Sequence, residues 1–310
     1  MLRLRLKGAA RRALTALAAA GLCLAAASCS PAAEPTSFNG DRAFEVLRRL
    51  VSFGPRPSGS PALAQARQWL IHELRATGAQ VEEDAFLAST PIGPISMTNL
   101  VAKFPAARRE TVIVAGHYDT KRFDRFRFVG ANDGGSSAAL LVELARVLSG
   151  RKHDLNYWLV FFDGEEAVRD WTATDSVYGS RHLVEKLTAS GELSRLQALI
   201  LVDMVGDARL RIARESNSTP WLNDLIFGVA RRLDYGKYFV NSEQAIEDDH
   251  QPFLEAGVAA ADLIDFDYGP DNSYWHTAQD TLEHCSPASL NIVGRVVEAT
   301  LGQLEKSPRP

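Results

Sequence analysis

Residues 157–166, Tyr-Trp-Leu-Val-Phe-Phe-Asp-Gly-Glu-Glu, decide the fold class of this chain. Six apolar residues are followed at once by a segment with three carboxylates. An apolar run without alternation is typical of a strand that is buried on both faces. The stretch therefore predicts a strand of a covered, mostly parallel sheet, with polar side chains gathered where the strand ends.

Other short β-rich runs and helical stretches extend this pattern along the chain. Further strands are predicted at 81–86, 99–104, 111–115, 198–202 and 258–264. Helical spacing is found at 42–50, 61–77, 136–148, 177–189, 221–233 and 287–304, with Asp41 as a possible N-cap of the first helix. The alternation predicts a three-layer α/β/α fold with a mixed, mostly parallel central sheet. Because no second linker interrupts it, residues 41–306 are expected to form a single catalytic domain.

The N-terminus has the composition of an export signal. Residues 1–12 contain five bases, and residues 13–28 form an apolar, Ala-rich run that ends before Cys29. We therefore expect a signal peptide at 1–28, of the lipoprotein type, and a Pro/Ser-rich tether at 29–40. Ala26 stands where lipoprotein signals prefer Leu, so plain cleavage is the alternative. The expected location is the periplasm of a bacterium, or its membrane through a lipid on Cys29.

Charge and cysteine content exclude several classes of protein. Beyond residue 12 the chain has 29 bases against 38 acids, a net charge of −9, which argues against a nucleic-acid partner. Three cysteines, of which Cys285 alone lies in the predicted domain, cannot form a disulfide scaffold. The segment 121–128 (KRFDRFRF) alternates bases and aromatics and is expected to form a flap at an entrance.

Acids and histidines follow the predicted strands. They are His117, Asp119, Asp133, Glu165, Glu166, Asp203 and, in a late loop, His276. The carboxyl ends of parallel strands meet at one edge of a sheet, so these side chains should converge. No buried base is apparent to neutralise them, and a bound cation would remove the cost of burying the carboxylates. Histidine with carboxylate suits Zn²⁺, and Asp119 could accept the free N–H of a metal-bound His117.

Each of these residues taken alone has a simpler interpretation. Asp133 stands directly before a helix and could be an N-cap, and Asp119 could cap a turn. Glu165 and Glu166 could be a solvated pair, and a single loop histidine is usually a surface residue. The joint arrangement favours a metal site, in which one of the two adjacent glutamates binds metal and the other transfers a proton.

The order of these residues resembles that of the zinc aminopeptidase family of secreted α/β exopeptidases. The resemblance implies metal positions at His117, Asp133, Glu166, Asp203 and His276, and a general base at Glu165. It is closer still to the animal-type glutaminyl-peptide cyclotransferases, a branch of the same fold. The matching stretches are residues 129–133, 161–167, 175–183, 248–254 and 275–277, together with Trp171.

The closer resemblance implies a particular reaction and a particular site. N-terminal glutamine of peptides or proteins would be closed to pyroglutamate with release of ammonia, with one Zn²⁺ per chain. We expect the chain to be a monomer. Asp133, Glu166 and His276 would hold that ion, while His117 and Asp203 would be candidates for a second. Glu165, Asp203 and Asp248 would form the catalytic group, and Trp171 and Trp275 would line the substrate pocket.

The chain also departs from the animal enzymes. Gly116 and Ala138 stand where those enzymes often have a disulfide, and Asp262 stands where they place a histidine. A two-zinc aminopeptidase is the alternative function, favoured by the complete set of five ligands. A non-catalytic binding lipoprotein that inherited the fold is a third possibility. Zinc stoichiometry would separate the first two, and the effect of Glu165→Gln would test the third.

Overall fold

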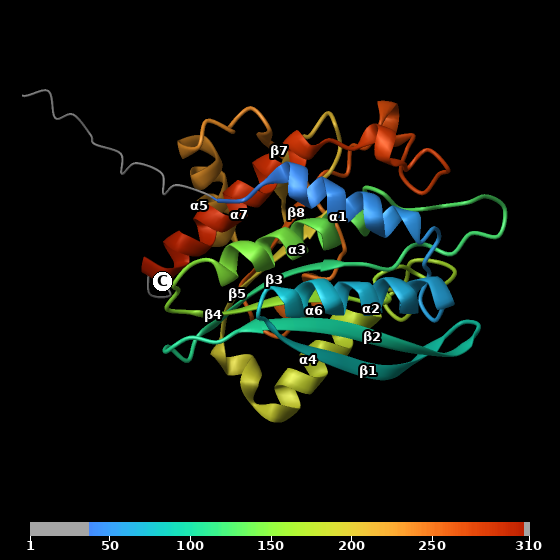
Figure 1. Ribbon diagram of the computed structural model, residues 1–310, viewed down its shortest axis with the longest axis horizontal. Helices are drawn as coiled ribbons and strands as arrows, with labels where there is room; N and C mark the ends of the chain where they lie inside the picture. Colours follow the sequence, from blue (N-terminus) through green and yellow to red (C-terminus); the bar gives the residue numbers. More distant parts are fainter. Residues whose placement is uncertain (1–36, 307–310) are drawn as a thin grey trace, which may run out of the picture. The chain divides into compact units, whose positions relative to one another are not determined.

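A six-stranded sheet forms the centre of the computed structural model, which describes residues 37–306 (Figure 1). The strand order is β1-β2-β4-β3-β5-β8. These strands are β1 (Gln80–Thr90), β2 (Gly93–Phe104), β3 (Thr111–His117), β4 (Asn156–Phe162), β5 (Leu196–Asp203) and β8 (Ala260–Ile264). Strands β4, β3, β5 and β8 run parallel, whereas β2 pairs antiparallel with both β1 and β4. The predicted mixed, mostly parallel sheet is therefore confirmed.

Helices cover both faces of the sheet, because the central strands are apolar on both sides. In β3, Val112 and Val114 belong to one hydrophobic core and Ile113 and Ala115 to the other. The first core is closed by α1 (Gly40–Ser52), α2 (Pro61–Ala76), α3 (Gly135–Ser149), α5 (Pro220–Arg232) and α7 (Pro287–Lys306). The second is closed by α4 (Tyr178–Ser190) and α6 (Gln251–Glu255), and Figure 1 shows α4 on the side of the sheet opposite α1 and α3. The predicted three-layer α/β/α fold is confirmed.

Several short elements were not predicted. Strands β6 (Ile212–Glu215) and β7 (Phe239–Gln244) pair in a separate two-stranded sheet. Short 3₁₀ helices occupy Glu192–Arg195, Pro270–Asn272 and Leu282–His284. No helix within residues 37–306 is long and apolar enough to span a membrane.

The beginning of the first helix differs from the expectation. The N-cap is Asn39, whose side chain accepts the N–H of Arg42, and not Asp41. Phe38 is only 1% exposed, and the backbone N–H groups of Ser37 and Phe38 donate to the carboxylate of Glu298 in α7. Residues 37–40, assigned to the tether from the sequence, therefore pack onto the domain. The predicted signal peptide, Cys29 and the rest of the tether lie outside the described residues.

The turn before α3 brings that helix against the end of β3. Gly134 has φ +73°, and a Cβ there would lie 2.4 Å from the carbonyl oxygen of Asp119 and 2.9 Å from the ring of His117. Only glycine accepts this backbone conformation and this close approach without strain. The turn places Asp133 directly opposite His117, at the carboxyl edge of the sheet.

Candidate metal centre and reaction cavity

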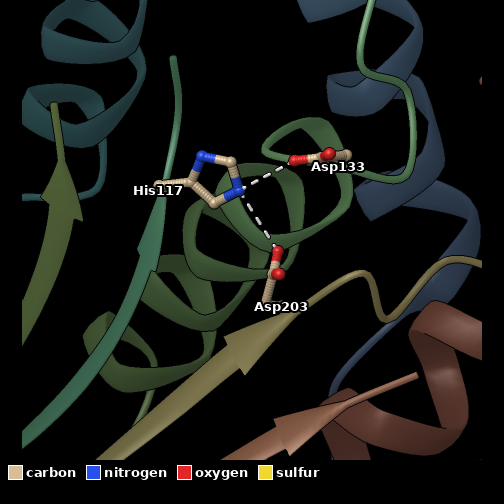
Figure 2. A group of neighbouring side chains, drawn as sticks. All are labelled: His117, Asp133 and Asp203. Carbon is tan, nitrogen blue, oxygen red and sulfur yellow. Dashed lines mark hydrogen bonds and ion pairs between the residues drawn. The ribbon is translucent and has the colours of Figure 1, made fainter. Parts of the chain in front are cut away.

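A histidine and two carboxylates converge at the ends of β3, β5 and the turn before α3. Nε2 of His117 lies 3.2 Å from Oδ1 of Asp133 and 3.2 Å from Oδ1 of Asp203. Figure 2 shows both carboxylates pointing at the same ring nitrogen. All three side chains are buried. One N–H cannot point at both carboxylates at once, whereas a cation between the three groups could contact all of them.

A second group of the same kind shares Asp133. Nε2 of His276 lies 3.1 Å from Oε1 of Glu166 and 3.2 Å from Oδ2 of Asp133. The ligand atoms of each group lie within 4.8 Å of one another. Asp133 thus faces one histidine with each of its two oxygens. The structure brings together all five residues that the sequence analysis named as metal candidates.

The electrostatics of the two groups call for positive charge. Burial lowers the pKa of His276, but the neighbouring carboxylates of Glu166 and Asp133 outweigh it and raise the pKa to about 10. The pKa of His117 is likewise raised well above its ordinary value, by Glu165, Asp119, Asp133 and Asp203 against the effect of burial. Carboxylates that draw protons onto histidine would equally draw a divalent cation. The donor set of imidazole nitrogen and carboxylate oxygen suits Zn²⁺.

Glu165 lies beside the metal candidates but faces a different atom. Its Oε2 is 3.6 Å from Nδ1 of His117. Burial, together with the charges of Glu166 and Asp248, raises the pKa of Glu165 well above its ordinary value although His117 opposes the shift. A carboxyl group with a raised pKa can both accept and return a proton near neutral pH.

Asp119 holds the other side of His117. Its Oδ1 lies 3.4 Å from Nδ1 of the ring, and the same atom accepts the backbone N–H of Glu165 at 3.4 Å. Both ring nitrogens of His117 are therefore flanked by carboxylates. Asp119 lies where the sequence analysis places a partner of that ring.

A cavity of about 400 Å³ opens onto these residues. Its acidic lining consists of Asp133, Glu165, Glu166, Asp203, Glu247 and Asp248. Trp171, Trp275, Ile246, Ile264 and Phe266 supply the apolar walls. Trp275 stacks on His276 with ring centroids 4.1 Å apart and leans on Phe266 at 4.9 Å. The volume is in the range of small-ligand sites, and the mixture of apolar walls with a few polar groups is typical of them.

The expectation that no buried base is available to neutralise the carboxylates is wrong. Lys121 lines the cavity, and its Nζ lies 3.7 Å from Oε2 of Glu166. Arg56 is fully buried behind the site and donates to the carbonyl oxygens of Tyr118, Val129 and Gly130. Burial lowers the pKa of Arg56 to about 10, although nearby carboxylates oppose the shift.

The segment 121–128 packs over the metal candidates through its aromatic side chains. Phe123 and Phe128 each approach the ring of His276 edge-on, with centroids 5.8 Å away. Phe123 also stacks on Phe126 at 4.5 Å. The aromatic positions of the alternating pattern thus face inward, and the bases Arg122, Arg125 and Arg127 are exposed.

Two buried acids that sequence reasoning missed hold the loops of the site. Asp280 accepts the backbone N–H groups of Asn132 and Asp133 at 2.7 and 3.2 Å. Glu215 accepts the N–H of Ser218 at 2.6 Å and of Ile246 at 3.1 Å, and lies 3.2 Å from Nε2 of His250. Glu215 therefore fixes the segment that carries Ile246, Glu247 and Asp248 to the cavity. Asp280 could have been proposed from the sequence because it follows the metal candidate His276 by four positions. No residue near Glu215 in the sequence indicated a role in the site.

Asp248 reaches the cavity, and the residues behind it form a buried acidic layer. Oδ1 of Asp248 accepts the N–H of Asp249 at 2.5 Å, and burial and neighbouring acids raise the pKa of Asp248 well above its ordinary value. Asp262 is fully buried, and neither of its oxygens has a hydrogen-bond partner. Its Oδ2 lies 4.0 Å from Nδ1 of His250. Asp262, the residue expected to replace a histidine of the animal enzymes, thus lies behind the cavity wall and not in its lining.

Glu215→Gln should weaken the fold by about 2–4 kcal/mol at pH 7, because a buried carboxylate with several donors is replaced by an amide that cannot accept them all. Burial raises the pKa of Glu215, but His250 and backbone N–H groups outweigh it and lower the pKa to about 2 from 4.5. The stabilisation is therefore complete above about pH 4.5 and is lost as the pH falls through 2. Urea unfolding of both proteins at pH 7, 4 and 3 checks this. A difference that stayed constant or grew on acidification would contradict it.

The doubly covered α/β sheet with histidine and carboxylates at its carboxyl edge is the arrangement that the resemblance to zinc exopeptidases implied. The chain belongs to peptidase family M28, whose family model matches residues 99–301.

Several similar proteins carry the name of a glutaminyl cyclase or of a cyclotransferase-like protein. The glutaminyl-peptide cyclotransferase-like protein of Bos taurus is 31% identical over 80% of this chain and 72% of its own length. The crystal structure of an Acidobacteriales bacterium glutaminyl cyclase is 39% identical, with a TM-score of 0.85, and covers 89% of this chain and 98% of that one. A Porphyromonas gingivalis glutaminyl cyclase is 29% identical with a TM-score of 0.79, over 86% of this chain and 98% of that one. The resemblance to glutaminyl-peptide cyclotransferases expected from the sequence is confirmed.

Proposed function

We propose that this chain is a metal-dependent glutaminyl-peptide cyclotransferase, which converts the N-terminal glutamine of peptides to pyroglutamate and releases ammonia. The observation that carries the proposal is one small cavity in which a His/carboxylate group, Glu165 and two tryptophans meet. Trp171 lies between Glu166 and Gly179, which are 13 positions apart, whereas typical aminopeptidases pass from Glu-Glu to Gly-Ser within a few residues. The glutaminyl-peptide cyclotransferase of Bos taurus, 30% identical over 78% of this chain, and the Acidobacteriales bacterium glutaminyl cyclase are named for this activity.

Asp133, Glu166 and His276 are the residues that would hold one Zn²⁺. When bound there, the ion supplies Lewis acidity toward the γ-amide carbonyl of the substrate. These three residues line the reaction cavity, whereas His117 does not. His117 lies behind the lining with its Nδ1 facing Asp119 and Glu165, and the proposal gives it the role of an oriented partner of Glu165.

Glu165 carries the proton in the proposed reaction. The α-amine nitrogen of the substrate forms the new bond to the γ-amide carbon, and the bond from that carbon to the amide nitrogen breaks. Glu165 accepts the proton that the amine loses and returns it to the departing nitrogen, which leaves as ammonia. Asp203 and Asp248 line the same cavity and stabilise the charge that develops on the amine. No nucleophile of the protein and no water are required.

Trp171 and Trp275 shape the space in which the glutamine folds onto itself. A flat amide and a five-membered ring fit between apolar walls, and exclusion of water strengthens the electrostatic interactions around Glu165. Much of the expected rate gain comes from holding the α-amine next to the side-chain amide of the same residue, because the bound glutamine has already lost the conformational freedom that the reaction would otherwise cost.

The proposal also concerns the location and state of the enzyme. Residues 1–28 would direct export, and Cys29 would carry a lipid or lie near a plain cleavage site. The enzyme would act as a monomer on peptides outside the cytoplasm.

The function is tested by mass spectrometry of a Gln-initiated peptide incubated with purified residues 37–310. We expect a product lighter by one ammonia, abolished by a chelator and restored by Zn²⁺. Removal of the entire first residue would instead establish the two-metal aminopeptidase, which the group His117, Asp133 and Asp203 favours. No reaction with glutamine or with other N-terminal residues would leave a binding protein.

A further inference from the structure

A second cavity, of about 290 Å³, adjoins the reaction cavity. Trp171, Glu247 and Asp248 line both. Trp171 is 38% exposed, as expected for a ring with a cavity on either side. The indole is therefore a partition, with the reaction cavity on one side and the second cavity on the other.

The partition is held in place by the protein itself. Nε1 of Trp171 donates to Oε2 of Glu247 at 3.3 Å. The loop before the tryptophan is turned around the carboxylate of Asp175, which accepts the backbone N–H groups of residues 168, 169 and 170 at 2.8–3.1 Å. The hydroxyl of Tyr178 donates to the same carboxylate at 2.8 Å. The protein's own hydrogen bonds thus fix the wall of the second cavity that Trp171 and its loop form.

The proposed function fixes the direction in which a peptide leaves the reaction cavity. In the proposed reaction the γ-amide would lie toward Glu166 and His276, and the α-amine toward Glu165 and Asp248, all of which line the cavity. The α-carbon of the following residue is only ~3.8 Å from that of the glutamine. It therefore lies at the amine side, where Asp248 lines both cavities.

On the metal side, the adjoining cavity among residues 37–306 is much smaller. The cavity that adjoins Glu166, lined also by Ala167 and Arg122, has a volume of about 10 Å³. That is room for one water molecule at most and not for a side chain. The second cavity is the neighbouring space that can accept the residue after the glutamine.

The charges of the second cavity favour a cation. Glu247 and Glu255 are exposed carboxylates in its lining. The basic residue of the lining, Arg181, directs its guanidinium into its own loop, where Nη2 donates to the carbonyl oxygen of Ser176 at 2.9 Å. We infer that the second cavity is a subsite for the side chain of the residue that follows the N-terminal glutamine, and that it prefers lysine or arginine there. This inference rests on the proposed function.

Three peptides that differ only at the second position test the subsite. Gln-Lys, Gln-Ala and Gln-Glu peptides with a common remainder are compared by kcat/KM for cyclisation. We expect the order Lys, Ala, Glu, with two- to fivefold between neighbours, the size of effect found for solvent-exposed ion pairs. The differences should shrink in high salt. Equal values for all three, or the reverse order, would overturn the preference.

Two glutamine variants locate the source of the preference. Glu255→Gln should lower the ratio of the Lys to the Glu peptide by about two- to fivefold. Glu185→Gln removes the same charge from an exposed position of α4 outside the lining and should leave the ratio as in the wild type. A ratio unmoved by Glu255→Gln would overturn the subsite even if the wild type preferred lysine. Failure to cyclise the Gln-Ala peptide at all would instead overturn the proposed function.

Discussion

Glu165→Gln is expected to lower kcat for cyclisation by about 10²–10⁴-fold, the usual contribution of a positioned general acid and base. The amide keeps the shape of the side chain but can neither accept the amine proton nor return one to ammonia. KM should change little, because the amide keeps the size and shape of the side chain on the cavity wall. Steady-state rates on a Gln-Ala peptide give both parameters.

Bound zinc and thermal stability serve as controls for this variant. The zinc content should equal that of the wild type, since Asp133, Glu166 and His276 remain, and the Tm should not fall. Glu185→Gln should retain wild-type kcat and shows that loss of a carboxylate elsewhere has no effect. Full activity in Glu165→Gln would refute the role of Glu165 as the group that transfers the proton.

His276→Ala and His117→Ala should differ sharply in their effects. A bound metal contributes several kcal/mol of transition-state stabilisation, so His276→Ala should lose activity by on the order of 10³-fold or more. His117→Ala should retain one tightly held zinc, and its loss of activity should be at least tenfold smaller than that of His276→Ala. The reason is that His117 contacts carboxylates of the proton path. Activity and zinc per chain, measured by atomic emission on dialysed protein, check both statements.

The outcome for His117→Ala also separates one metal from two. If wild-type protein holds two zinc ions of equal affinity and His117→Ala holds one with activity lost, the aminopeptidase-type centre is present. One ion in the wild type and one in His117→Ala supports the proposed centre. A chelator should inactivate the wild type in either case. The number of zinc ions per chain therefore decides between the two centres, and the sensitivity to a chelator does not.

The elements of the sheet could be predicted because each buried parallel strand is a short apolar run with its own boundary. The run Tyr157–Phe162 corresponds to β4 apart from one residue, since both faces of that strand are covered. The N-cap at Asn39 was missed because an acid at Asp41 offers the same local signal, and only the packing of Phe38 on α7 decides between them. Strands β6 and β7 are too short and too mixed in polarity to be distinguished from loops.

The site was predictable to the extent that it follows the strands. His117, Glu165, Glu166 and Asp203 stand directly after apolar runs, so topology alone brings them together. Lys121 and Glu215 stand in polar segments and meet the site through contacts distant in sequence. Lys121 reaches Glu166 from the loop after β3, and Glu215 accepts the backbone N–H of Ile246, which stands 31 positions later. Burial of such residues depends on the assembled fold and leaves no local pattern.

The carboxylate that Asp133 shares between two histidines has an evolutionary consequence. Because one oxygen faces His117 and the other faces His276, both cradles remain complete in a protein that uses only one of them. A lineage could therefore change the number of ions it holds without replacing a single ligand, by adjusting the neighbours that draw His117 toward Asp119 and Glu165. The metal-ligand residues would then be the same before and after the change of reaction. The residues of the cavity walls, such as the loop of Trp171, would differ between the two activities.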